Sequence, residues 1–304
     1  MVKPGSDPYC GGDEAESGML YLGFSIVCSV VAVLIGRRGL QKNASPFMIG
    51  AIAFLTAAVI SVVFSAIAGQ FPEFEILDAL FGAVTGVVFA LGGYFLLRGL
   101  EEKTFVVPIS ALRVAMLAPI ILAVLFFDGL ASLSTTGAIG LGVGCVGLAL
   151  LAIGGKPTEV ENRDSFARNA WFNTAFVVVI FAFGFIGIQA FSAVVMNPGE
   201  NGLFLIFLFG VGGLVQLGLT LRRKNGFGGA PYGIGMGAFL FASYLLLLLA
   251  LAVMPGWKAF GAAACGHVVL AGAAGLILTG DRFQAVGYLG LGAAALGTGL
   301  VFFG

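Results

Sequence analysis

The chain has 304 residues, of which 59% are hydrophobic and only 10% are charged, and its formal net charge is zero. A soluble domain carries about 25% charged residues, so this composition, with a mean hydropathy of +1.06, excludes a water-soluble globular enzyme. A chain without net charge also offers no basic surface for nucleic acid.

The N-terminal stretch is polar and mostly acidic. Lys3 stands against four acids before residue 18. A cleavable signal peptide would carry positive charge there, so residues 1–17 are predicted to form an extramembrane segment.

The remainder is dominated by ten apolar runs. A hydrocarbon core about 30 Å thick requires about 20 apolar residues per helix, and the runs lack the alternation of a barrel wall. We therefore predict an all-α membrane protein with ten transmembrane helices. The predicted spans are residues 18–36, 46–68, 77–99, 104–127, 134–153, 171–196, 203–221, 233–253, 258–279 and 284–303.

The second half repeats the glycine spacing of the first. Four glycines of the fifth span recur in the tenth: Gly137, Gly140, Gly142 and Gly147 as Gly287, Gly290, Gly292 and Gly297. A second set recurs from the third span to the eighth: Gly82 and Gly86 as Gly233 and Gly237. An odd number of spans per half turns the second copy upside down. We predict two inverted five-helix repeats, 18–153 and 171–304, joined by a polar linker, 154–170.

These glycines predict close helix packing through small residues. They also make the fifth and tenth spans candidates for a homodimer contact. Trp171 and Trp257 lie at span ends, which is typical of indole rings at the membrane interface.

Basic residues are concentrated on one side of the predicted spans. Twelve follow the odd-numbered spans, against Lys3 and Lys258 on the other side: Arg37, Arg38, Lys42, Arg98, Lys103, Lys156, Arg163, Arg168, Arg222, Arg223, Lys224 and Arg282. The positive-inside rule places these loops in the cytoplasm. Both termini are then extracytoplasmic, in a protein of the cell (inner) membrane.

Three short segments near the span ends form a pattern. The run from Tyr94 to Leu100 leads into Pro108–Leu112, Asp128 precedes the fifth span, and Gly280–Arg282 precedes the tenth. Together they resemble the EamA type of the drug/metabolite transporter superfamily, over nearly the whole chain. The resemblance implies a central cavity lined by spans one to four and six to nine, with spans five and ten outside it.

Members of that family carry amino acids, nucleotide sugars, phosphorylated metabolites, amines or drugs, so the resemblance leaves the substrate open. Two features depart from its pattern. Most ten-span relatives keep both termini in the cytoplasm. The small multidrug-resistance relatives use a carboxylate in the first span, whereas these spans hold no Asp or Glu away from their ends. Drug-cation/proton antiport by that mechanism is therefore disfavoured.

Arg113 is the most informative polar residue. It lies about nine residues into the fourth span, roughly 14 Å deep at 1.5 Å per residue. Burying it costs at least about 2.5–3.5 kcal/mol, so it is expected to face a cavity or a partner. There it would bind an anionic group; the alternative is an arginine that ties helices together through backbone carbonyls. Pro108 and Pro119 flank it and predict a kink.

The single histidine, His267, lies at the same depth in the ninth span. Aligning the repeats on Asp128 and Asp281 places it one residue from the position equivalent to Arg113. We expect both side chains to flank one cavity, where an imidazole could also relay protons; the alternative is a hydrogen-bonded packing residue. Ser110 shares a helix face with Arg113. The weaker substrate-binding candidates are Ser110, Tyr94, Gln189, Ser243 and Tyr244.

The spans lack the groups that catalysis requires. They hold no paired carboxylates, Ser/His pair or metal-ligand cluster, and the four cysteines are scattered without metal spacing, so no enzyme activity, cofactor or metal is predicted. The 29 phenylalanines are expected to be mostly lipid-facing. We predict a secondary transporter that moves a small polar metabolite, anionic or zwitterionic, across the bilayer by alternating access. The alternative is a lipid-handling protein, such as a scramblase or a flippase of a lipid-linked precursor.

Overall fold

The computed structural model describes residues 12–68, 75–102, 106–128, 133–154, 163–194, 201–221, 229–279 and 284–303. Several predictions concern residues outside these ranges. They include the Gly280–Arg282 segment and the basic residues Lys3, Lys103, Lys156, Arg222, Arg223, Lys224 and Arg282.

Helices account for every element in the described ranges. They are α1 Gly12–Gln41, α2 Pro46–Ile67, α3 Ile76–Glu102, α4 Val106–Val114, α5 Leu117–Leu122, α6 Thr135–Gly154, α7 Arg163–Val194, α8 Asn201–Leu221, α9 Ala230–Val253, α10 Gly256–Ala274 and α11 Ala285–Phe303. Two π-helical segments, η1 Ala123–Phe127 and η3 Gly275–Thr279, continue α5 and α10.

The described helices include nine that are long and apolar enough to cross a membrane. In α6, the apolar segment Thr135–Leu151 is shorter than that length. The prediction of an all-α membrane protein is therefore confirmed. Large apolar side chains on the outer surface, such as Phe24, Phe183 and Ile277, are more than half exposed, as expected where lipid replaces water.

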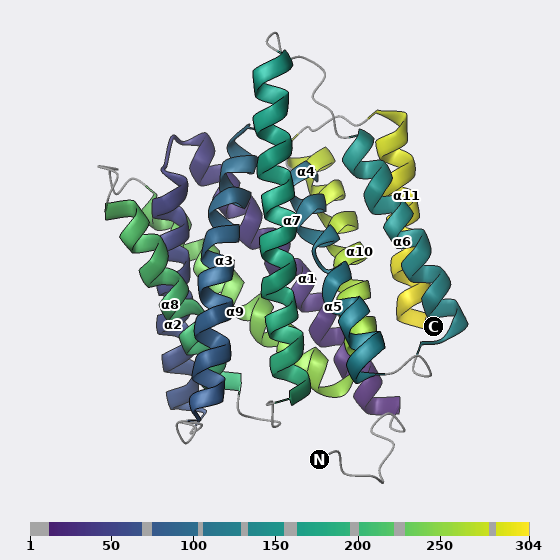
Figure 1. Ribbon diagram of the computed structural model, residues 1–304, viewed down its shortest axis with the longest axis horizontal. Helices are drawn as coiled ribbons and strands as arrows, with labels where there is room; N and C mark the ends of the chain where they lie inside the picture. Colours follow the sequence, from purple (N-terminus) through teal and green to yellow (C-terminus); the bar gives the residue numbers. More distant parts are fainter. Residues whose placement is uncertain are drawn as a thin grey trace.

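Two helices begin well before the predicted spans. α1 starts at Gly12, before the predicted span at 18, and α7 starts at Arg163, inside the predicted linker. Hydropathy indicates where a chain enters the hydrocarbon core, whereas a helix continues as long as its backbone hydrogen bonds do. In Figure 1, α7 rises above the rest of the bundle.

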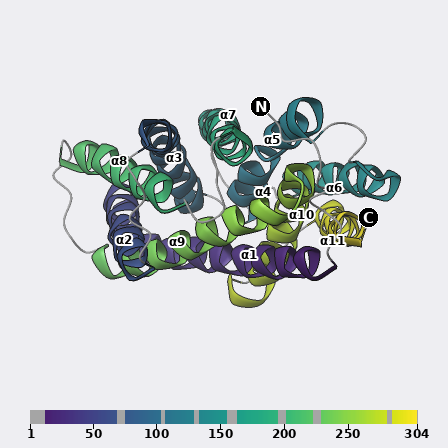
Figure 2. The same cartoon turned by 90° about the horizontal axis from the view of Figure 1, so that it is seen from below.

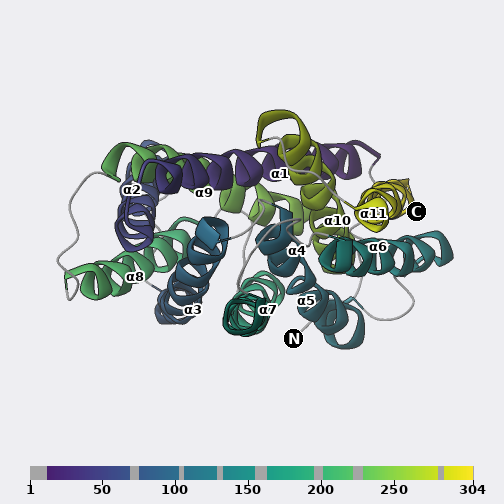
Figure 3. The same ribbon diagram turned by 90° about the horizontal axis from the view of Figure 1, so that it is seen from above.

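The helices form two rows with a pair at one end (Figures 2 and 3). One row contains α8, α3, α7 and α5, and the other contains α2, α9, α1 and α10. α4 lies between the rows, and α6 packs against α11 at the end of the molecule. The buried side chains between the rows form the core.

The repeated glycines allow the closest helix contacts. A Cβ at Gly147 would meet the backbone of Gly290 and Ala294 in α11, and a Cβ at Gly297 would meet the backbone of Gly140 and Gly144 in α6. The prediction of close packing through small residues is therefore confirmed for α6 and α11.

The second glycine set makes equivalent contacts elsewhere. Gly82 and Gly86 of α3 abut the backbone of α8, while Gly233 and Gly237 of α9 abut the backbone of α2. By contrast, a Cβ at Gly142 or Gly292 would have no atom of the described residues within 4 Å. The homodimer contact stays a prediction.

Trp257 differs from its expected interfacial position. Its side chain is only 2% exposed and packs where a Cβ on Gly137 would stand. The glycine leaves a space that the indole ring fills, so burial against α6 replaces contact with the membrane interface. The side chain of Trp171 lies outside the part of the chain that is described.

Candidate functional site

The central cavity lies between the two rows of helices. Its lining residues come from α1, α2, α3, α4, α7, α8, α9 and α10 together with Met116; in the described ranges, none comes from α6 or α11. Its volume is about 60 Å³, which is space for a few water molecules. The lining includes Arg113, His267, Ser243 and Tyr244 among the predicted residues.

Arg113 enters the cavity from the last turn of α4 and is 3% exposed. Its Nη2 donates to Ser29 Oγ at 2.8 Å, and its Nη1 lies 3.8 Å from Met116 Sδ. Its Nε has no hydrogen-bond partner in the described part of the chain. A thioether is a weak acceptor, and no backbone carbonyl of the described residues satisfies the guanidinium. Arg113 therefore keeps N–H donors that can bind an anionic ligand. Its position at a helix C-terminus is also favourable for a cation.

The fourth span is interrupted beside Arg113. α4 ends at Val114 and α5 begins at Leu117. Pro119 has no N–H to donate to the Ala115 carbonyl, which accepts instead from Ala118 at 3.4 Å, and the Met116 N–H bonds the Arg113 carbonyl at 3.0 Å. The predicted proline interruption is thus confirmed on the C-terminal side of Arg113.

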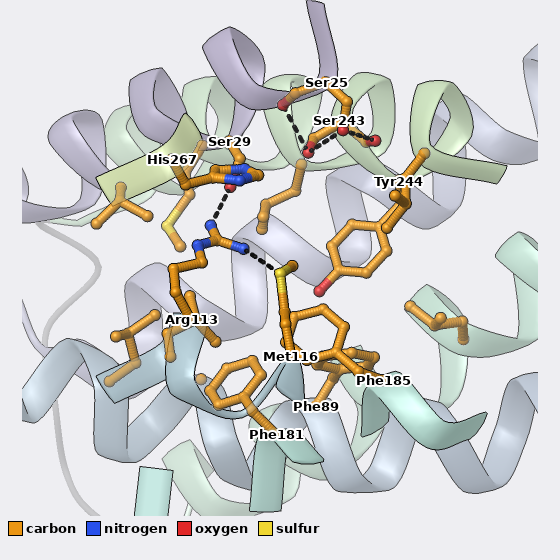
Figure 4. Close-up of a pocket in the computed structure, with 18 of the residues that line it drawn as sticks. Ser25, Ser29, Phe89, Arg113, Met116, Phe181, Phe185, Ser243, Tyr244 and His267 are labelled. Carbon is orange, nitrogen blue, oxygen red and sulfur yellow. Dashed lines mark hydrogen bonds between the residues drawn. The ribbon is translucent and has the colours of Figure 1, made fainter. Parts of the chain in front are cut away.

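His267 reaches the cavity from α10 and is 2% exposed. Its Nδ1 is hydrogen-bonded to the backbone carbonyl of Ala263 one turn earlier. A carbonyl only accepts, so Nδ1 carries the proton, and Nε2 in the neutral ring is an acceptor. Nε2 has no partner among the described residues. The histidine therefore presents a hydrogen-bond acceptor beside the cation (Figure 4).

Serines of α1 and α9 complete this side of the cavity. Ser25 Oγ donates to the Ser243 carbonyl at 2.8 Å, and Ser243 Oγ donates to the Ser25 carbonyl at 3.0 Å. These reciprocal bonds join two helices that are distant in sequence. Sequence reasoning missed Ser25 and Ser29, because small hydroxyls in an apolar span give no signal of what lies opposite them.

The opposite side of the cavity is aromatic. The Phe89 ring lies 5.3 Å from the rings of Phe181, Phe185 and Tyr244. Phe54 and Phe209 also line the cavity and lie 5.9 Å apart in an edge contact. The expectation that phenylalanines mostly face lipid is wrong for these five, because the packing of α2, α3, α7 and α8 around the cavity turns their rings inward.

Three predicted residues lie outside the cavity lining. Ser110 lies one turn from Arg113 but is fully buried outside the lining. Gln189 packs against Gly256. Tyr94 stacks on Phe47, with ring centroids 4.2 Å apart, and its hydroxyl accepts from Arg98 Nη1 at 3.2 Å. The structure therefore brings Arg113, His267, Ser243 and Tyr244 together and leaves Ser110, Gln189 and Tyr94 apart from them.

Asp128 links two helices near the end of the bundle. Its Oδ2 accepts from the Trp257 N–H at 3.3 Å, at the first turn of α10. A carboxylate at a helix N-terminus is favourable. Burial nevertheless raises the pKa of the Asp128 carboxyl, and hydrogen bonds from the Trp257 and Gly256 N–H groups lower it only in part.

We expect Asp128→Ala to destabilise the protein by about 0.5–2 kcal/mol, because an N–H of α10 loses its acceptor. Asp128→Asn should cost less, since its amide oxygen can still accept. Burial raises the folded-state pKa of this carboxyl, so its contribution to the stability of the folded protein is fully present below the unfolded-state pKa. That contribution is lost as the pH rises through the folded-state pKa. Thermal unfolding of the three proteins between about pH 4 and pH 7 measures both effects. Equal stability of the Ala and Asn variants would contradict the capping role.

Comparisons with known proteins identify the fold and no family. No family model matches the chain, and no curated protein matches it. Solved structures do match. One, described only as "Crystal structure of protein", has a TM-score of 0.66 over 94% of this chain and 95% of that chain, at 13% identity. At that identity the match shows a shared fold along nearly the full length.

Proposed function

We propose that the protein is a secondary transporter that binds a small anionic or zwitterionic metabolite in the central cavity. The observation that supports this most is the state of Arg113: a buried cation, between two rows of membrane helices, whose donors are only partly used. Charged groups within membrane segments are costly and are typical of substrate pathways. His267 Nε2 adds an acceptor that suits the ammonium of a zwitterion.

The proposal includes ten spans in two inverted five-helix repeats. Helix packing supports it, because contacts exchange between the halves: α1 packs on α9 as α7 packs on α3, and α2 packs on α9 as α8 packs on α3. The π-helical segments η1 and η3 occupy equivalent places at the ends of the fourth and ninth spans. Such repeats allow alternating access by rocking one half against the other.

The resemblance to EamA-type drug/metabolite transporters is part of the same proposal. Cavity lining drawn from spans one to four and six to nine is what that resemblance implies. Glycine contacts between α6 and α11, away from the cavity, suit the expected position of spans five and ten.

A transport assay tests the function directly. A thermal-shift screen of metabolites on the purified protein should find a ligand that raises the unfolding temperature, because binding to the folded state stabilises it. That ligand should exchange across proteoliposomes containing the protein and not across empty ones. Scrambling of labelled lipids without exchange of any bound metabolite would favour the lipid-handling alternative and contradict this proposal.

We further propose that both termini are extracytoplasmic. In Figure 1, α3 ends and α7 begins at the upper end of the bundle, while α1 begins and α11 ends at the lower end. The basic residues near the C-terminal ends of α1 and α3 and near the start of α7 lie at this upper end. The positive-inside rule places that end of the bundle in the cytoplasm.

We expect Lys3→Cys, in a Cys10→Ser background, to react with a membrane-impermeant thiol reagent in intact cells. Arg222→Cys should react only after permeabilisation, because the two sites are on opposite sides of the membrane. The reverse pattern of labelling would place both termini in the cytoplasm.

A further inference from the structure

The central cavity has two chemically different walls. Ser25, Ser29, Ser243 and His267 of α1, α9 and α10 lie on one side, and the guanidinium of Arg113 points toward them (Figure 4). The rings from α3 and α7 form the other side. A ligand that satisfies both walls must itself have a polar end and an apolar end.

The polar wall holds one permanent charge. Among the described residues that line the cavity, Arg113 is the only arginine or lysine, and there is no Asp or Glu. His267 offers an acceptor lone pair, which repels anionic oxygens. A second negative charge on the ligand would therefore be buried without a cation, at high cost. This wall suits a single carboxylate.

The apolar wall holds few hydrogen-bonding groups. In the part of the chain that the structure describes, fourteen of the twenty lining residues are apolar, and five of these are phenylalanines. Hydroxyl groups of a sugar would lose water there without finding partners. An aromatic ring would instead meet the Phe89, Phe181 and Phe185 rings in edge or offset contacts.

We propose that the cavity binds organic monoanions with an aromatic or similarly large apolar body, the carboxylate on Arg113 and the body against Phe89, Phe181 and Phe185. This inference rests on the proposed function, because a cavity of about 60 Å³ must widen during alternating access before it admits an aromatic ring. It separates this chain from carriers of phosphorylated or polyhydroxylated metabolites.

Phenylacetate is a suitable probe for the purified full-length protein. It should raise the unfolding temperature, and its dissociation constant should be at least about tenfold lower than those of 2-phenylethanol and phenethylamine, which lack the negative charge. Acetate has the charge without the ring, and malonate adds a second charge; both should bind at least about tenfold more weakly. Failure of phenylacetate to stabilise the protein, or tighter binding of malonate, overturns the inference.

Two phenylalanines of α7 provide a matched pair. Phe185 lines the cavity and contacts Phe89, whereas Phe191 is fully buried against Phe204 outside the lining. Phe185→Leu should weaken phenylacetate binding by about two- to tenfold, and Phe191→Leu should leave the affinity unchanged. Equal effects of the two substitutions would contradict the aromatic wall as a binding surface.

Transport and binding can fail separately. If phenylacetate binds with this pattern but is not exchanged across proteoliposomes, the binding inference holds and the transporter proposal fails. If a polar dianion is exchanged while phenylacetate neither binds nor competes, the transporter proposal holds and the inference fails.

Discussion

Arg113→Gln is expected to lower transport, and the affinity for an anionic ligand, by at least about tenfold. Glutamine keeps polarity and similar length but removes the charge that faces the cavity. The fold should survive, because the substitution also removes the cost of burying a cation. Exchange in proteoliposomes and ligand-induced thermal stabilisation measure the two quantities on the same preparation.

Arg98→Gln is the matched control. Arg98 is an exposed arginine of α3 that donates to the Tyr94 hydroxyl, outside the cavity lining, so its loss should leave transport unchanged. Arg113→Lys should retain part of the activity, because it keeps the charge but not the planar donor geometry. Unchanged transport by a folded Arg113→Gln protein would make Arg113 structural and remove the main support for an anionic substrate.

Gly147→Val is expected to destabilise the bundle strongly. A Cβ at this position would lie 2.5 Å from the Ala294 backbone nitrogen and 2.8 Å from the Gly290 carbonyl oxygen. Neither backbone can move aside as a flexible side chain could, so α6 and α11 must separate. Overpacking in a core costs about 1–3 kcal/mol or more. The unfolding temperature and the yield of monodisperse protein should both fall.

Gly142→Val separates this effect from helix propensity. Gly142 lies on the same helix, is exposed, and has open space around it. The two substitutions change the backbone entropy alike, so only the steric contact differs between them. Similar stability of the two variants would contradict a tight α6–α11 contact.

Apolar run length predicted the helices well but not where they begin. The thickness of the hydrocarbon core sets the number of apolar residues that each helix needs, so the spans can be predicted without tertiary information. α7 begins within the predicted linker because a helix can extend beyond the membrane with polar residues. The position of Trp257 at a span end predicts an interfacial side chain. The structure instead buries it, because Gly137 of another helix leaves the space that the indole ring fills.

The sequence alone predicted two things about the candidate site: that Arg113 lies well inside a span, and that His267 lies one residue from the equivalent position when the two proposed repeats are aligned. Both follow from counting along single helices. Only the tertiary structure decided that Ser29 is the partner of Arg113 and that a wall of phenylalanine rings faces it, since these groups come from separate helices. A phenylalanine that faces lipid and one that faces a cavity satisfy the same apolar pattern, because neither meets bulk water. The difference between them arises only when the helices pack.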